Sequence, residues 1–112
     1  MKKTDKKLDN AITAVLTQAC DIALLQHDGF VWLTHLVNYQ RFPKSLAIVC
    51  VFETNDQLAK ADQDNLRALI KAQLATIDIA LNNQQIHVDT EENCNNQNNG
   101  EWQERFERIN NT

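Results

Sequence analysis

The sequence predicts an α+β fold in which two amphipathic helices pack on a small sheet built around a β-hairpin. A strongly apolar stretch from Phe30 to Glu53, interrupted by one proline, predicts the hairpin. An apolar pattern with helical spacing on each side of it predicts the helices. We therefore expect two layers in the order helix, strand, strand, helix, strand, followed by a short C-terminal helix.

Both strands of the hairpin are expected to be apolar on both faces. One face of the first arm would carry Val31, Leu33, His35, Val37 and Tyr39, and the other Phe30, Trp32, Thr34, Leu36 and Asn38. In the second arm, one face would carry Leu46, Ile48, Cys50 and Phe52, and the other face Ala47, Val49 and Val51. Pro43 disfavours helix at the residue before it, so the alternative of a helix here is set aside in favour of a turn over residues 40–45.

The helices are predicted from apolar stripes and their capping signals. The stripe before the hairpin consists of Leu8, Ile12, Val15, Ala19 and Ile22, widened by Ala11, Leu16 and Ala23, and the stripe after it of Leu66, Leu69, Ile70 and Leu74. Thr4 and Gly29 suit the ends of the first helix. The second helix has two possible starts, a capping box at residues 54–57 and Asp62.

The last third of the chain is expected to be less regular. Residues 77–81 fit either a continued helix or an extra strand, and residues 86–89 fit a short strand. We expect one α+β domain over residues 1–92, an Asn-rich linker over 93–100 and an amphipathic segment over 101–112. Trp102, Phe106 and Ile109 share one face of that segment, which would dock on its own domain or on a partner chain.

Composition limits the classes of function. Eleven basic and fifteen acidic residues among 112 give a net charge of −4, which speaks against a general nucleic-acid binder. We expect no transmembrane helix and no signal peptide, and hence a cytoplasmic protein. The three cysteines, Cys20, Cys50 and Cys94, lie far apart and predict neither a disulfide framework nor a zinc site.

The sequence contains no motif of a nucleotide-binding or hydrolytic enzyme, and Gly29 and Gly100 are its only glycines. We therefore expect no cofactor, no catalytic residue and no metal, and a non-enzymatic binding or regulatory module. A nucleic-acid contact would rest on the basic residues Lys2, Lys3, Lys6, Lys7, Arg41 and Lys44. Because two helices would leave part of a sheet with two apolar faces uncovered, we also expect a homodimer.

Two enzyme alternatives remain open. His87, Asp89 and Glu91, with Glu92, lie at the end of a predicted strand and would hold a divalent metal in a metal-dependent enzyme, although a solvated acidic tail fits the same residues better. His35 and Cys50 would form a nucleophilic pair if they faced each other in the hairpin. A hydrogen-bonded histidine in the core is the favoured interpretation of His35, because buried polar groups are normally paired.

Four segments carry a resemblance that covers the chain to about Cys94: TDKKLDN at 4–10, WLTHLVNY at 32–39, VCVF at 49–52 and EENC at 91–94. They resemble a small family of short bacterial proteins that is often catalogued as Fis-family transcriptional regulators. The resemblance implies a transcription-associated role and DNA binding, and it assigns no DNA-contacting residue. The expected order of elements is also similar to that of ribosome-binding factor A, which implies an RNA-binding or ribosome-associated alternative with KH-like topology.

Overall fold

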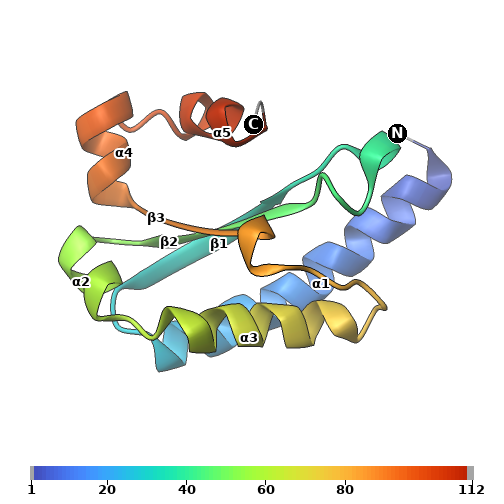
Figure 1. Ribbon diagram of the computed structural model, residues 1–112, viewed down its shortest axis with the longest axis horizontal. Helices are drawn as coiled ribbons and strands as arrows, with labels where there is room; N and C mark the ends of the chain where they lie inside the picture. The colour runs from blue at the N-terminus through green and yellow to red at the C-terminus, as the bar shows by residue number, and fades with distance from the viewer. Residues whose placement is uncertain (1, 111–112) are drawn as a thin grey trace.

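The computed structural model describes residues 2–110, without the side chain of Asn110. Met1 and residues 111–112, which belong to the expected 1–92 and 101–112 segments, lie outside the described residues. In chain order the elements are α1 (Lys3–Gln26), β1 (Phe30–Leu36), the 3-10 turn η1 (Tyr39–Arg41), β2 (Ala47–Phe52), α2 (Asn55–Lys60), α3 (Gln63–Ala75), the 3-10 turn η2 (Asn83–Gln85), β3 (Ile86–Thr90), α4 (Glu91–Asn98) and α5 (Trp102–Asn110) (Figure 1). The α+β class and the short C-terminal helix are confirmed.

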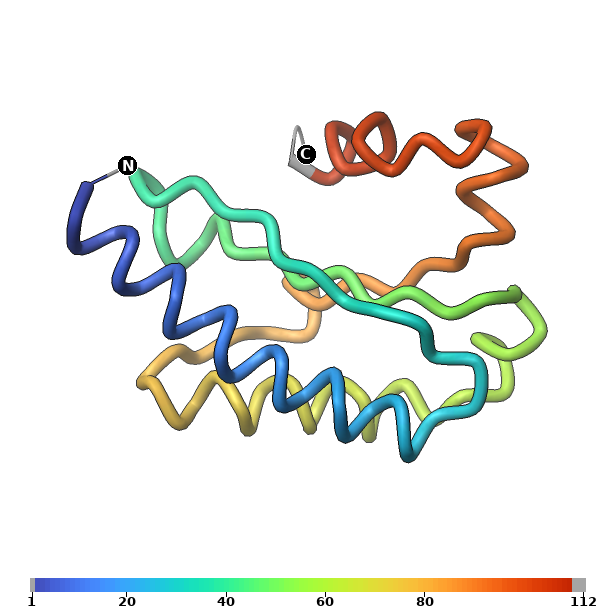
Figure 2. The backbone as a smooth tube through the Cα atoms, turned by 180° about the vertical axis from the view of Figure 1, so that it is seen from behind, coloured from blue at the N-terminus to red at the C-terminus, as the bar shows by residue number. Residues whose placement is uncertain are grey.

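Within the described residues, the strands form one mixed sheet in the order β1-β2-β3. The central strand β2 pairs antiparallel with β1, as a hairpin requires, and parallel with β3. Helices α1 and α3 lie side by side on one face of the sheet, while α4 and α5 lie on the opposite side (Figures 1 and 2). The C-terminal helices thus add partial cover to the face that we expected to lie bare.

The core lies between the sheet and the α1–α3 pair. Every residue of β2 is buried, as the two-sided apolar pattern predicts for a central strand. The predicted stripes supply the other side of this core, with Ile12, Leu16, Ala19 and Ala23 from α1 and Leu66, Ile70 and Leu74 from α3. The apolar periodicity therefore identified the buried face of both helices.

The alternation expected for the first arm of the hairpin fails at its start. The register of β1 against β2 shifts between Phe30 and Trp32, which is a β-bulge at Val31. Because of this extra residue, Phe30 joins the core face and its ring lies edge-on to Phe52 with centroids 5.7 Å apart. Val31 is left 37% exposed.

Both starts proposed for the second helix are used. Thr54 forms the expected capping box with Gln57 and begins α2, and Asp62 accepts a hydrogen bond from the backbone of Asn65 and begins α3. The backbone is extended at Ala61 between them. Residues 77–81 form neither the extra strand nor a continued helix, because α3 ends at Ala75 in a turn that includes the left-handed Asp78.

The Asn-rich segment is not an irregular linker over its whole length, because Glu91–Asn98 form α4. Hydrogen bonds take the place of the apolar burial that this composition lacks. The buried Thr90 caps the helix by accepting from the backbone of Asn93 at 3.0 Å and donates to Asn55 Oδ1 at 2.6 Å. The helix ends at Asn99 and Gly100, which both adopt positive φ.

Helix α1 also bears on the expectation that no segment spans a membrane. Its length and composition alone would permit it to cross a bilayer. In the structure it carries Ile12, Leu16, Ala19 and Ala23 into the core instead. A cytoplasmic location stays a prediction.

Candidate functional site

Asp9 joins the N-terminal half of α1 to the hairpin. Its Oδ1 lies 2.9 Å from Nε2 of His35 on β1 and accepts a hydrogen bond of 2.6 Å from the hydroxyl of Tyr39 in η1. These two contacts, His35 first, hold the pKa of Asp9 below its usual value. Burial, and then the Asp9 carboxylate, raise the pKa of Tyr39. The start of α1 is therefore fixed beside the β1–β2 connection.

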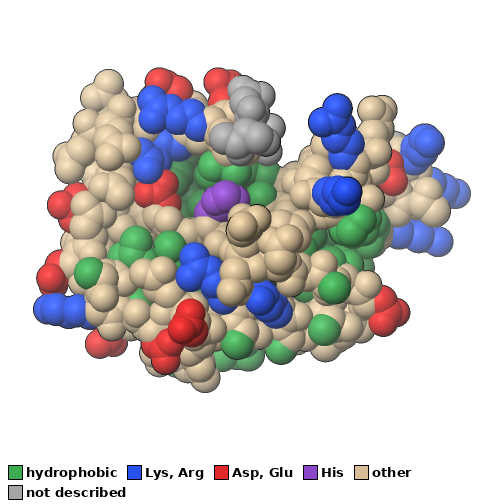
Figure 3. Space-filling model, in the orientation of Figure 1, with side chains coloured by type: hydrophobic (Ala, Val, Ile, Leu, Met, Phe, Trp, Pro, Cys, Tyr) green, Lys and Arg blue, Asp and Glu red, His purple; other side chains and the backbone are tan. Residues whose placement is uncertain are grey.

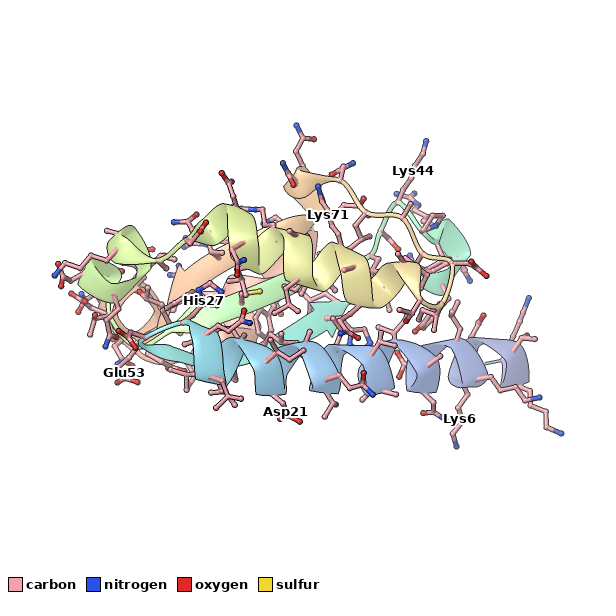
Figure 4. The ribbon with its side chains drawn as sticks, turned by 90° about the horizontal axis from the view of Figure 1, so that it is seen from below. Lys6, Asp21, His27, Lys44, Glu53 and Lys71 are labelled. Atoms are coloured by element: carbon pink, nitrogen blue, oxygen red, sulfur yellow. The ribbon has the colours of Figure 1, made fainter. Side chains whose placement is uncertain are left out.

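This junction gathers the predicted basic residues at one end of the molecule. The N-terminus of α1 lies near η1 in Figure 1, and Figure 4 shows Lys6 and Lys44 at the end opposite to His27 and Glu53. We call this region the basic end; it comprises Lys2, Lys3, Lys6 and Lys7 of the first turns and Arg41 and Lys44 of the connection. All six side chains are exposed, and blue side chains gather there in Figure 3.

A hollow of about 900 Å³ opens beside the basic end. Its floor includes Ala47 and His87, its walls are residues 41–46 of the connection and η2, and Ile109 of α5 also lines it. Figure 3 looks onto this part of the surface, where apolar and histidine side chains lie below the rim. Burial, and then the positive charge of Arg67, lower the pKa of His87.

The connection that forms the wall of the hollow is held by its own hydrogen bonds. Ser45 Oγ donates to Asn38 O at 2.6 Å and accepts from Asn38 N at 3.0 Å. The side-chain amide of Gln85 donates to the carbonyls of Pro43 and Leu46, each at 3.0 Å, and so ties η2 to the connection. The Phe42–Pro43 peptide bond is cis. Arg41 and Lys44 therefore project from an ordered turn.

The aromatic residues predicted to bind a partner pack within their own chain. The rings of Trp102 and Phe106 lie edge-on to Trp32, with centroids 4.9 and 6.4 Å away. Glu91 accepts hydrogen bonds from both indoles, at 2.6 Å from Trp32 and 3.2 Å from Trp102. Ile109 lines the hollow. Of the two alternatives for this segment, the structure shows docking on its own domain.

The acidic residues considered for a metal are engaged by other groups. Asp89 forms a two-pronged ion pair with Arg105, in which Nε and Nη2 donate at 2.8 and 2.9 Å. Glu91 is bonded to the indoles, and Glu92 accepts from the backbone at the start of α2. Within residues 2–110, no three His, Cys, Asp or Glu side chains are grouped to hold a metal ion. His87 lines the hollow.

The possible Cys–His pair is not formed. Cys50 lies opposite Leu33 in the hairpin, while His35 lies opposite Ile48 and bonds to Asp9. Burial raises the pKa of Cys50 to about 12, so its thiol stays protonated at neutral pH. Cys20, Cys50 and Cys94 are all free thiols. The reading of His35 as a hydrogen-bonded histidine of the fold is the one that the structure shows.

Sequence reasoning missed the residues that hold the basic end and the hollow in place. Asp9 lies 26 and 30 residues from its partners His35 and Tyr39, and no local motif links them. Asn38 and Ser45 flank Pro43 and are typical turn residues, which is the one signal that was available. Comparisons with models of protein families, with curated proteins and with solved structures found no match.

Proposed function

We propose that this chain is a non-enzymatic binding module with a regulatory, transcription-associated role, and that its basic end contacts the phosphate backbone of nucleic acid. One observation carries the proposal: the bonds of Asp9 to His35 and Tyr39 hold the start of α1 and the β1–β2 connection, with their basic residues, at the same end of the molecule. Lys6 and Lys44 point to opposite sides of this end in Figure 4, so a nucleic acid that contacts both sets of cations would have to pass around it. Cations that concentrate at one end of a protein can each contact a phosphate.

The uneven distribution of charge supports this site in a chain of net charge −4. Asp89, Glu91 and Glu92 lie on the far side of the sheet, where Arg105 and the indoles engage two of them. Lysines at the start of α1 oppose the helix dipole, so they cost some helix stability unless an anion offsets their charge. A nucleic-acid phosphate would supply that charge.

The proposal is tested by fluorescence anisotropy with a labelled DNA duplex and a labelled single-stranded RNA at low salt. Replacing Lys2, Lys3, Lys6 and Lys7 by Gln is expected to weaken binding at least tenfold, since each phosphate contact adds to the affinity. The control replaces Lys60 of α2 and Lys71 of α3, which lie outside the basic end, by Gln and should bind like the wild type. Affinity unchanged by the four α1 substitutions would rule out this site.

An RNA-binding or ribosome-associated role is the second candidate. The order helix, strand, strand, two helices, strand, with β3 parallel to β2, favours it, because this order is similar to the KH-like order expected from the sequence. The two helices between the hairpin and the last strand are separated by the extended residue Ala61. The comparison of RNA with DNA in the same titration separates the two candidates. We do not propose the metal-dependent enzyme, because Asp89 and Glu91 are bonded to Arg105 and to the indoles.

We also propose that the chain forms a homodimer. Helix α5 covers part of the sheet face that we expected a second copy to cover, so that face does not support a dimer. Exposed apolar side chains now support the proposal: Leu24 is 49% and Leu25 90% exposed at the C-terminal end of α1. This surface lies away from the basic end, so a dimer formed through it leaves both basic ends open.

A further inference from the structure

The lining of the hollow beside the basic end is selective in charge. Its lining includes two cationic side chains, Arg41 and Lys44. Although the chain has fifteen Asp and Glu residues, none is among the described residues that line this hollow. A site with cations and no carboxylate attracts an anion and repels a cation, so charge complementarity points to an anionic occupant.

The hollow also offers apolar surface next to these cations. Val37, Phe42 and Leu46 line the connection side, and Ala47 lies on the floor. Its volume of about 900 Å³ lies within the range of roughly 300–1,000 Å³ that is usual for small-molecule sites. Polar and apolar residues share this lining about equally, and such a mixed lining suits an organic molecule with an acidic group better than a bare inorganic ion.

The backbone that carries Arg41 and Lys44 is held in place before any ligand arrives. Ser45 and Asn38 bond to each other across the connection, and Gln85 clamps the carbonyls of Pro43 and Leu46. A wall that is already ordered loses little conformational freedom when it binds, which favours affinity. The planar guanidinium of an arginine suits two-pronged binding of a carboxylate, sulfonate or phosphate.

We propose that this hollow binds a small organic anion, with Arg41 and Lys44 contacting the acidic group and the apolar lining holding the body of the molecule. The inference goes beyond nucleic-acid binding, although Arg41 and Lys44 belong to both sites. The lysines of α1 do not line the hollow, so the two proposals fail independently. A ligand in the hollow would compete with nucleic acid for the two shared cations.

The test uses two dyes that differ in charge. 8-Anilinonaphthalene-1-sulfonate is an anion with an apolar aromatic ring system, and N-phenyl-1-naphthylamine is the same ring system without the sulfonate. Fluorescence titration is expected to show the sulfonate binding about tenfold more tightly than the neutral dye. In proton–nitrogen NMR spectra, the sulfonate should shift the amide signals of residues 37–47, 84–87 and their neighbours, and not those of the α1–α3 core.

Replacing both Arg41 and Lys44 by Gln should remove the preference for the sulfonate and leave the neutral dye unchanged. Both side chains are exposed, so the variant should keep the wild-type thermal midpoint. The Lys60→Gln/Lys71→Gln variant should bind both dyes like the wild type, and replacing the four lysines of α1 should also leave the preference intact. Equal binding of the two dyes, a preference that survives R41Q/K44Q, amide shifts in the core, or no binding of the sulfonate would each overturn the proposal.

Discussion

Replacing Arg105 by Ala should loosen the C-terminal helix and destabilise the whole domain. The guanidinium pairs with Asp89 at 2.8 and 2.9 Å, and it also donates to Gln97 at 2.9 Å and Asn98 at 3.0 Å. The side chains of the ion pair are only 14% and 15% exposed. One side chain therefore joins α5, α4 and β3.

The expected cost follows from what the substitution leaves behind. Removing one member of a buried pair strands the other charge, which costs about 3–5 kcal/mol. Because this pair keeps some exposure, we expect about 3 kcal/mol. Replacing Asp89 alone should cost a similar amount. The double variant D89A/R105A strands no charge, so its loss should fall short of the sum of the single losses by about 2 kcal/mol.

Urea unfolding of the four proteins, followed by circular dichroism and by tryptophan fluorescence, measures these losses. Trp32 and Trp102 lie in the cluster that α5 completes, so their emission reports on the same contact. A loss below about 0.5 kcal/mol for R105A, or losses that simply add, would refute the reasoning, since surface substitutions behave in that way.

Three other predictions concern parts of the chain away from this ion pair. Asp9→Asn should cost about 1–2 kcal/mol at pH 7, because Asp9 bonds to His35 and Tyr39. Because the folded pKa of Asp9 lies below 3.8, this contribution is present above that pH and is lost as the pH falls through the lowered value, so urea midpoints of variant and wild type should converge in acid. Cys50 should resist iodoacetamide in the native protein and react in denaturant, as mass mapping of the peptides would show; labelling of the native thiol would contradict its burial. Leu25→Glu should change the free energy of unfolding by less than about 0.5 kcal/mol, and it should halve the molecular mass that light scattering measures. A wild type that is monomeric in the same measurement would contradict the proposed homodimer.

The elements that the sequence predicts well are those with a strong apolar period. Every residue of β2 is buried, as its continuous apolar run indicates, and the stripes of α1 and α3 face the core. The bulge at Val31 escaped prediction because alternation along one strand does not reveal where its partner slips by a residue. Phe30 was consequently assigned to the wrong face.

The helix α4 escaped for a different reason. An Asn-rich segment buries little apolar area, so its composition predicts disorder. The hydrogen bonds that order it come from residues outside it, Thr90 at its N-terminal cap and Arg105, which donates to Asn98. For the candidate site, the sequence identified the basic residues and left their arrangement open. Asp9 connects them through His35 and Tyr39, and contacts over such separations follow from the fold and not from a local motif.

The salt dependence of nucleic-acid binding tests the central claim most directly. Plotting the logarithm of the association constant against the logarithm of the salt concentration gives a slope that counts phosphate contacts. If the basic end is the contact surface, each of Lys2, Lys3, Lys6 and Lys7 that touches a phosphate should lower the steepness of that slope by about one when replaced by Gln. A slope that is the same for the wild type and the fourfold variant would contradict the claim, and so would a wild type whose binding does not depend on salt.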